Sequence, residues 1–290
     1  MRLLLLSAIL CFLNACGAKS ALQFLDDPSS TPASETNGFP GVVRVFGPSG
    51  GLCTGTFVSP RAVLTATHCA LKTGIYKVAT DWGTFSTGTV VRHGTGTPAD
   101  TNDISILIFD SSIADESANQ VIPISNNIDI HEKVTVVGFG CNDVENHTGT
   151  NVKRAGQNRL YQRTNFLELA TPRSVLKEKR IIGPDNISGT CFGDSGGPLL
   201  KSSNFGYEVV GVTHGGSWST EILLSLFSDL GKADNWVFLE DTESSHDLFL
   251  TRPCESPQSR LPQCQTNQAI TGIVSLLKWM LSKVAAWIGF

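Results

Sequence analysis

From Phe39 onward, the chain alternates short apolar runs with Gly, Pro, Asn and Thr residues, which favour turns. The runs predict strands at residues 42–46, 55–58, 62–65, 89–92, 104–109, 134–137, 198–200 and 209–213. Helical periodicity is scarce before Asp234. Many short strands separated by turns are typical of an all-β sandwich or of β-barrels, and they argue against a parallel α/β sheet.

The composition is that of a folded chain with a sizeable core. Hydrophobic residues make up 41% and charged residues 17%, which excludes an intrinsically disordered chain. The length suits about two structural units of roughly 150 residues each. The formal charge of −4 gives no electrostatic reason to expect nucleic acid as a partner. Eight Cys residues indicate an oxidising compartment if they pair.

The N-terminal residues resemble an export signal. A basic start and an apolar core too short to span a bilayer precede Leu13-Asn14-Ala15-Cys16, which resembles a bacterial lipobox. We therefore expect residues 1–15 to be a lipoprotein signal peptide and Cys16 to carry the lipid; ordinary cleavage after Ala18 is the alternative. Residues 26–35 are polar and lack an apolar period, and we expect residues 16–38 to form a disordered tether. The expected location is a bacterial membrane, on its periplasmic side or at the surface, or else the protein is secreted.

Three short segments carry residues with catalytic chemistry. His68 ends the apolar segment LTATHC, Asp103 opens the apolar segment in TNDISIL, and Ser195 lies among glycines in GDSGGP. A Ser hydroxyl is a poor nucleophile at neutral pH, because little alkoxide exists. An imidazole can take its proton, and a carboxylate can orient and stabilise that imidazole.

The order and surroundings of these segments resemble the trypsin-like (chymotrypsin-fold) serine proteases over roughly Phe39–Glu240, including the stretch CTGTFVSPRAVLTATHC that leads into the His. The resemblance implies an all-β fold of two six-stranded antiparallel β-barrels packed face to face, with short C-terminal helices. It assigns the first barrel to residues 39–124 and the second to residues 125–240.

The resemblance also implies a role for each residue. Ser195 is the expected nucleophile, His68 its general base and Asp103 the carboxylate that orients His68. The backbone amides of Gly193 and Ser195 are the expected oxyanion hole. Asp103 matches directly, in NDI followed by alternating Ser and aliphatic residues, and is preferred over two competing carboxylates, Asp100 and Asp110.

The family also pairs the cysteines that correspond to Cys53 and Cys69. Cys191 lacks its usual partner in the loop after the later strand, and Cys141 is the best remaining mate. Cys254 and Cys264 would then form a local loop in the tail. No CxxC motif or paired His spacing supports a metal site, so we expect neither a metal nor another cofactor.

The chain departs from the family at its start. No Ile-Val-Gly-Gly motif, whose freed amine pairs with the Asp before the nucleophile in many animal members, occurs between Cys16 and Phe39. Either the oxyanion hole forms without zymogen cleavage, or a cut upstream of Phe39 supplies a new terminus. Because a buried charge without a partner is costly, a cation or donor must replace the amine at Asp194.

The residues expected in the substrate pocket also differ from those of trypsin, which has an Asp where this chain has Gly189. The wall positions are Thr190, Thr213 and Gly216. A preference for Lys or Arg is therefore not expected, whereas small, aliphatic or acidic side chains remain open. His214 stands where the family usually has Ser, and it either supports the catalytic Asp or reads the substrate.

Beyond the family-like region, residues 241–267 are predicted to form a polar tail and residues 268–290 an amphipathic helix. Lys278 and Lys283 interrupt that helix, which argues against a membrane-spanning helix. It could lie on a membrane, as a second contact beside the lipid at Cys16, or pack on this protein or a partner.

The sequence thus predicts an exported serine endopeptidase that hydrolyses protein or peptide substrates through an acyl-enzyme, without nucleic acid as a partner. The alternative is a protease-like binding protein that is inactive or latent because it lacks the N-terminal activation segment. A fluorophosphonate probe, which labels only an activated serine, discriminates between the two.

Overall fold

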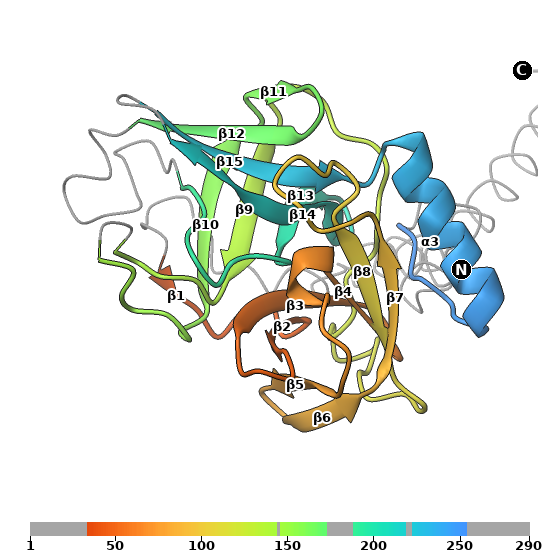
Figure 1. Ribbon diagram of the computed structural model, residues 1–290. Coiled ribbons are helices and arrows are strands. Elements are labelled where there is room, and N and C mark those ends of the chain that lie inside the picture. The colour runs from red at the N-terminus through yellow and green to blue at the C-terminus, as the bar shows by residue number, and fades with distance from the viewer. Residues whose placement is uncertain (1–33, 144–145, 173–187, 219–221, 254–290) are drawn as a thin grey trace, which may run out of the picture.

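The computed structural model describes residues 34–143, 146–172, 188–218 and 222–253 (Figure 1). Within these ranges the strands form two antiparallel sheets, and one α-helix follows them. The strands of the first sheet are β2 (Val42–Phe46), β3 (Leu52–Ser59), β4 (Ala62–Thr65), β5 (Tyr76–Thr80), β6 (Gly83–Thr87), β7 (Thr89–His93) and β8 (Ile104–Ile108). Those of the second are β1 (Ser34–Glu35), β9 (Lys133–Gly138), β10 (Arg154–Arg159), β11 (Gln162–Arg163), β12 (Leu167–Pro172), β13 (Pro198–Ser203), β14 (Gly206–Trp218) and β15 (Ile222–Asp229). The helix is α3 (Ala233–His246).

The first sheet curls into a barrel. Its order is β6-β5-β2-β3-β4-β8-β7, so its two edge strands, β6 and β7, are consecutive in the chain and separated only by Gly88. The two can be counted as one bent strand, whose first half pairs at one edge of the sheet and whose second half pairs at the other. Counted this way, the seven described strands form the six-stranded barrel that was expected. Strands β2 to β8 all lie within residues 39–124.

The second sheet follows the same plan. Its order is β1-β10-β9-β13-β14-β15-β12-β11, and β10 continues into β11 after two residues. Counting β10 and β11 as one bent strand, six strands form this barrel as well, and β1 is an addition at its edge. The fold is therefore the expected pair of antiparallel β-barrels, seen one below the other in Figure 1.

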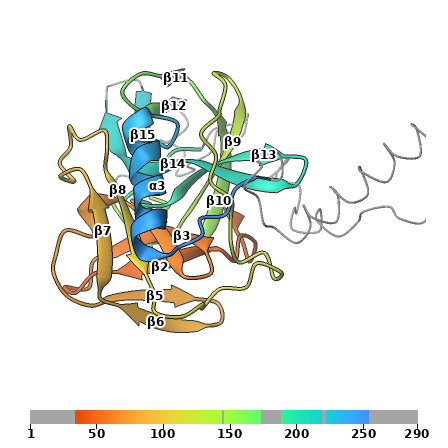
Figure 2. The same cartoon turned by 90° about the vertical axis from the view of Figure 1, so that its right-hand side faces the viewer.

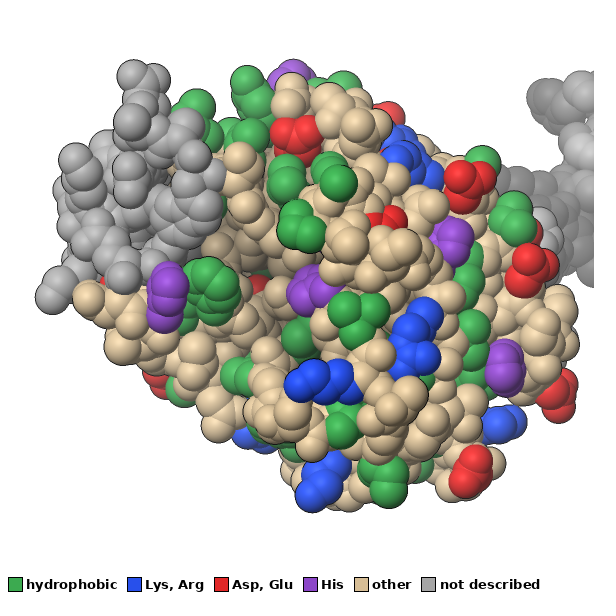
Figure 3. Space-filling view, viewed as in Figure 1, with side chains coloured by type: hydrophobic (Ala, Val, Ile, Leu, Met, Phe, Trp, Pro, Cys, Tyr) green, Lys and Arg blue, Asp and Glu red, His purple; other side chains and the backbone are tan. Residues whose placement is uncertain are grey.

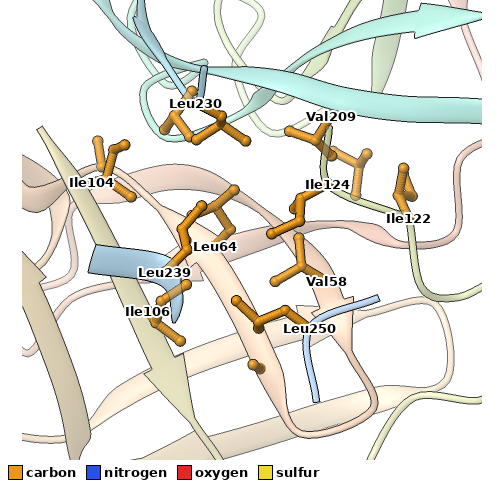
Figure 4. Close-up of a cluster of buried hydrophobic side chains, with 14 of the residues drawn as sticks. Val58, Leu64, Ile104, Ile106, Ile122, Ile124, Val209, Leu230, Leu239 and Leu250 are labelled. Atoms are coloured by element: carbon orange, nitrogen blue, oxygen red, sulfur yellow. The ribbon is translucent and has the colours of Figure 1, made fainter. Parts of the chain in front are cut away.

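A shared apolar core joins the two barrels. Leu64 and Ile106 of the first sheet, Val209 of the second and Leu239 of α3 are all at most 1% exposed and belong to one buried cluster (Figure 4). Figure 2 shows α3 running across the side of the molecule, over both sheets. Because this packing fixes one barrel against the other, residues from both can meet at a site between them.

Two predicted boundaries are wrong. Residues 34 and 35 are not part of a disordered tether, because β1 pairs with β10 through Ser34–Ala155 and Glu35–Arg154.

The polar tail also begins later than expected. Helix α3 extends to His246, and Leu248 and Leu250 after it are buried in the shared core. The backbone amide of Thr251 then donates to the carbonyl of Val58 at 2.7 Å. Residues 1–33 and 254–290, with the predicted signal, Cys16, the Cys254–Cys264 pair and the helix over 268–290, lie outside the described residues. No helix within the described ranges has the length and apolarity needed to cross a membrane.

Candidate active site

His68 and Asp103 form a close pair at the junction of the barrels. Nδ1 of His68 lies 2.6 Å from Oδ2 of Asp103, and the backbone amide of His68 donates to Oδ1 at 2.8 Å. The Asp103 side chain is fully buried, whereas the His68 side chain is 27% exposed. The carboxylate therefore fixes both the ring and the backbone of a histidine that is accessible to solvent.

Strand pairing brings these two residues together. His68 lies in a 3₁₀ turn, Thr67–Cys69, directly after β4, and Asp103 directly precedes β8. Strands β4 and β8 pair in antiparallel register, with Thr65 opposite Ser105, so the end of one meets the start of the other. The hydroxyl of Thr67 donates to the carbonyl of Ile104 at 2.6 Å and closes this junction.

The surroundings of Asp103 keep it ionised. Burial alone raises the pKa of a carboxyl group, but hydrogen bonds from His214 and His68 outweigh burial and lower the pKa of Asp103 to about 2. Asp100, one of the competing carboxylates, instead accepts hydrogen bonds from the backbone amides of Gly96 and Asn102 within its own loop.

Ser195 lies on the second barrel between two glycines with left-handed backbone angles. Gly193 has φ +101° and Gly196 has φ +80°, a region of backbone angles that residues other than Gly rarely adopt. A Cβ on Gly196 would also lie only 2.4 Å from the carbonyl oxygen of Thr54. The carbonyl of Ser195 accepts the backbone amide of Thr54 at 2.8 Å, which holds the serine loop against the first barrel.

The amides expected to form the oxyanion hole are available. Among the described residues, the backbone amides of Gly193 and Ser195 have no hydrogen-bond acceptor. The carbonyl of Gly193 accepts the Thr54 hydroxyl at 2.8 Å, and the same oxygen of Thr54 accepts the amide of Phe139 at 3.2 Å. Thr54, from the first barrel, therefore fixes the orientation of the Gly193 peptide.

Asp194 has hydrogen-bond partners that the sequence analysis could not name. Its Oδ1 accepts the backbone amide of Gly140 at 2.7 Å, and its Oδ2 accepts that of Cys191 at 2.9 Å. Burial raises the pKa of Asp194 to about 6, although these two amides and the charge of Arg154 lower it. Among the described residues, the hydrogen-bond donors to the Asp194 carboxylate are therefore backbone amides.

Disulfides join both expected pairs in the described part of the chain, Cys53–Cys69 and Cys141–Cys191. The first links β3 to the turn that carries His68. The second spans a sequence separation of 50 residues and ties the end of β9 to the loop that carries Ser195. Each bridge therefore stabilises one half of the site.

A cavity of about 230 Å³ opens beside Ser195. Its lining residues are Thr190, Cys191, Phe192, Ser195, Thr213, His214, Gly215, Gly216 and Leu223. Three of the four expected pocket residues are among them. The fourth, Gly189, instead lines a separate cavity of about 30 Å³ beside Asp194. Figure 3 shows a hollow between the two halves of the molecule, with a histidine at its edge.

Leu223 is the pocket residue that the sequence analysis missed. Its Cδ2 lies 3.1 Å from the point that a Cβ on Gly189 would occupy, and the side chain is only 1% exposed. Leu223 thus lies close to Gly189 and also lines the cavity beside Ser195. No local pattern in the sequence marks this residue, because its position depends on the pairing of β14 with β15.

His214 supports the carboxylate of the close pair. Its Nδ1 lies 2.7 Å from Oδ2 of Asp103, the same oxygen that faces His68. The sequence left two roles for His214, support of the catalytic Asp and recognition of the substrate. The hydrogen bond to Asp103 favours the supporting role.

Two groups of side chains in the described ranges have the composition of metal ligands. One comprises Cys53, His68 and Cys69, but its two sulfurs form a disulfide. The other comprises His68, Asp103 and His214, whose facing atoms are 2.6 and 2.7 Å apart. These are hydrogen-bond distances, shorter than the separation of two ligands on a tetrahedral metal ion, so this group does not fit a metal.

Comparisons with known proteins agree with this geometry. Among solved structures, neuropsin, a serine protease expressed in the limbic system of mouse brain, superposes with a TM-score of 0.50 at 18% sequence identity, covering 74% of this chain and 97% of neuropsin. This likeness shows the fold. A comparison with curated protein sequences gives no match. A profile of the trypsin family matches residues 29–237, which is most of the chain. The protein therefore belongs to the trypsin family.

Proposed function

We propose that this protein is a serine endopeptidase that hydrolyses peptide bonds through an acyl-enzyme intermediate. The observation that carries the proposal is the buried carboxylate of Asp103, 2.6 Å from Nδ1 of His68, beside a cleft that Ser195 lines. A buried, ionised carboxylate stabilises the imidazolium that forms when His68 accepts a proton, and this is the charge that acyl transfer creates.

The proposed reaction has two halves. In the first, Oγ of Ser195 attacks the carbonyl carbon of the scissile bond while Nε2 of His68 takes the hydroxyl proton. The amides of Gly193 and Ser195 then stabilise the oxyanion, and loss of one such donor costs about 3–4 kcal/mol of barrier. His68 returns the proton to the leaving amine, which departs and leaves an ester on Ser195.

In the second half, a water molecule attacks this ester and gives a proton to His68. The acid product leaves as His68 returns that proton to the Ser195 oxygen. The proton count balances over the cycle, so no cofactor is required.

The proposed substrates have a small or medium aliphatic residue before the scissile bond. None of the described residues that line the 230 Å³ cavity is Asp, Glu, Lys or Arg. Burying a Lys or Arg side chain there would leave its charge without a partner, which is costly. Leu223 lines this cavity close to Gly189, and we propose that its side chain limits the depth of the pocket for large side chains.

Labelling with a biotinylated fluorophosphonate tests the proposal. The wild type and a Ser117→Ala control, which changes an exposed loop serine, should label on Ser195 as mapped by mass spectrometry. Ser195→Ala should not label, and His68→Ala should label more slowly by roughly 10⁴-fold or more. A folded wild type that does not label would refute the proposal and favour the inactive binding protein.

We also propose that the protein is exported and anchored through a lipid on Cys16, with secretion as the alternative. Two features support export: the lipobox-like residues before Cys16 and the disulfides Cys53–Cys69 and Cys141–Cys191, which persist in oxidising compartments. The expected result is membrane association of the wild type and its loss in a Cys16→Ser variant truncated before residue 268. Equal membrane association of both proteins would contradict a lipid anchor.

A further inference from the structure

A second imidazole faces the carboxylate of Asp103. His214, on β14, is 8% exposed, and its Nδ1 lies 2.7 Å from Oδ2 of Asp103. Its other ring nitrogen, Nε2, lies 3.1 Å from the carbonyl oxygen of Pro98. Both nitrogens of the His214 ring therefore face oxygen atoms at hydrogen-bond distance.

These contacts determine how many protons His214 carries. A backbone carbonyl has no hydrogen to donate, and Asp103 is ionised, so both oxygens can only accept. Each contact is a hydrogen bond only if the facing nitrogen carries a proton. Both bonds exist together only in the imidazolium form, because neutral imidazole has a single N–H.

The groups around His214 favour this cation. Asp103 and Asp100 are the acidic groups near the ring, and the His68 ring stands edge-on with its centroid 6.1 Å away. On the side of the second barrel, the uncharged ring of Phe166 stacks on His214 at 4.9 Å. Burial lowers the pKa of His214, but the hydrogen bonds to Asp103 and Pro98 and the negative charges of Asp103 and Asp100 outweigh it and raise the pKa.

We infer that His214 is a positioning residue that holds a positive charge beside Asp103, on the same carboxylate oxygen that orients His68. The inference rests on the proposed function, in which unprotonated His68 is the general base. His214 and His68 share one carboxylate oxygen, so a charge on the first ring disfavours a second charge on the other. Where the family usually has Ser at this position, no such charge is present.

The pH dependence of kcat/KM on a peptide substrate tests the inference. Two variants remove the charge in different ways: His214→Ser removes the ring, and His214→Asn keeps an N–H donor near the position of Nδ1. In both, the acid limb of the profile should move to higher pH by about one unit, because the charge lost lay close to His68. The control His131→Asn replaces an exposed histidine with positive φ by a residue that tolerates that angle, and it should leave the profile unchanged.

The Asn variant separates the charge from a merely structural role. If His214 acted only by holding Asp103 in place, His214→Asn would retain the wild-type acid limb. That result, or an acid limb that does not move in either variant, would overturn the inference.

A second measurement does not depend on activity. In Ser195→Ala protein with ¹⁵N-labelled histidine, both ring nitrogens of His214 should carry a proton at pH 6, visible as two one-bond N–H correlations. A single protonated nitrogen would overturn the inference. If fluorophosphonate fails to label the wild type while this signature is present, the proposed function has failed and the charge state of His214 stands.

Discussion

Two buried threonines on β3 provide a matched test of how the barrels hold the oxyanion hole. Thr54 and Thr56 are 0% and 1% exposed. The hydroxyl of Thr54 donates to the carbonyl of Gly193 at 2.8 Å and accepts the amide of Phe139 at 3.2 Å. The hydroxyl of Thr56 has no hydrogen-bond partner among the described residues. Valine has nearly the same shape as threonine, so substitution at each position changes the hydrogen bonding and little else.

The expected effects are opposite. Thr54→Val leaves a buried carbonyl and a buried amide without partners, and each costs about 1–3 kcal/mol, so the free energy of unfolding should fall by about 2–6 kcal/mol. Thr56→Val removes an unpaired hydroxyl from an apolar environment and should be neutral or stabilising by up to about 2 kcal/mol. Thr54→Val should also lower kcat by roughly 10-fold or more, because the Gly193 amide loses its fixed orientation.

Denaturant unfolding followed by tryptophan fluorescence measures both effects on stability. The variants are compared in a Ser195→Ala background, with disulfides intact, so that proteolysis does not distort the transitions. The kcat measurement uses the same substitutions with Ser195 present. Equal stability of the Thr54→Val and Thr56→Val proteins would refute the reasoning that Thr54 joins the barrels through these hydrogen bonds.

Three further predictions concern the surroundings of Ser195. The pKa of Asp194 rises from 3.8 to about 6 on folding, so the native state binds the extra proton, and the free energy of unfolding should fall by about 2 kcal/mol as pH rises from 4 to 7. Denaturant unfolding across that range should show a fall that Asp194→Asn lacks; the same slope in both proteins would contradict it. Leu223→Ala should raise kcat/KM for Phe relative to Ala before the scissile bond by about 10-fold or more, and an unchanged ratio would rule out its role in limiting the pocket. Replacing Cys141 and Cys191 by Ser should lower the free energy of unfolding by about 4 kcal/mol, measured in the same way; a loss near zero would contradict a stabilising bridge.

The sequence predicts the strands that have continuous apolar character. The expected strands at 42–46 and 62–65 coincide with β2 and β4 because turn residues flank each apolar run. Strand β10 escaped prediction because its sequence, RAGQNR, is polar. Its Asn158 is nevertheless buried, because the side-chain amide donates to the carbonyl of Ser188 at 2.8 Å. A partner distant in the sequence thus permits a buried strand that hydrophobic patterning cannot reveal.

The same limit applies to the site. The segments around His68 and Asp103 carry local signals, and the structure brings the two side chains together. The donors to Asp194 are backbone amides, which every residue possesses, so no residue type identifies them in advance. The second bond of His214 ends on the carbonyl of Pro98, which is equally invisible in the sequence. Contacts made with backbone atoms can therefore be identified only from the three-dimensional structure.

The central claim is that Ser195 forms a covalent acyl intermediate with the help of His68. Rapid acid quenching during turnover of an activated peptide ester, followed by tandem mass spectrometry, tests this claim most directly. The account predicts an acyl group on Ser195 in the wild type, its absence in Ser195→Ala and a strongly reduced amount in His68→Ala. Turnover of the ester by the wild type with no acyl group on Ser195, or with the acyl group on another residue, would contradict the account.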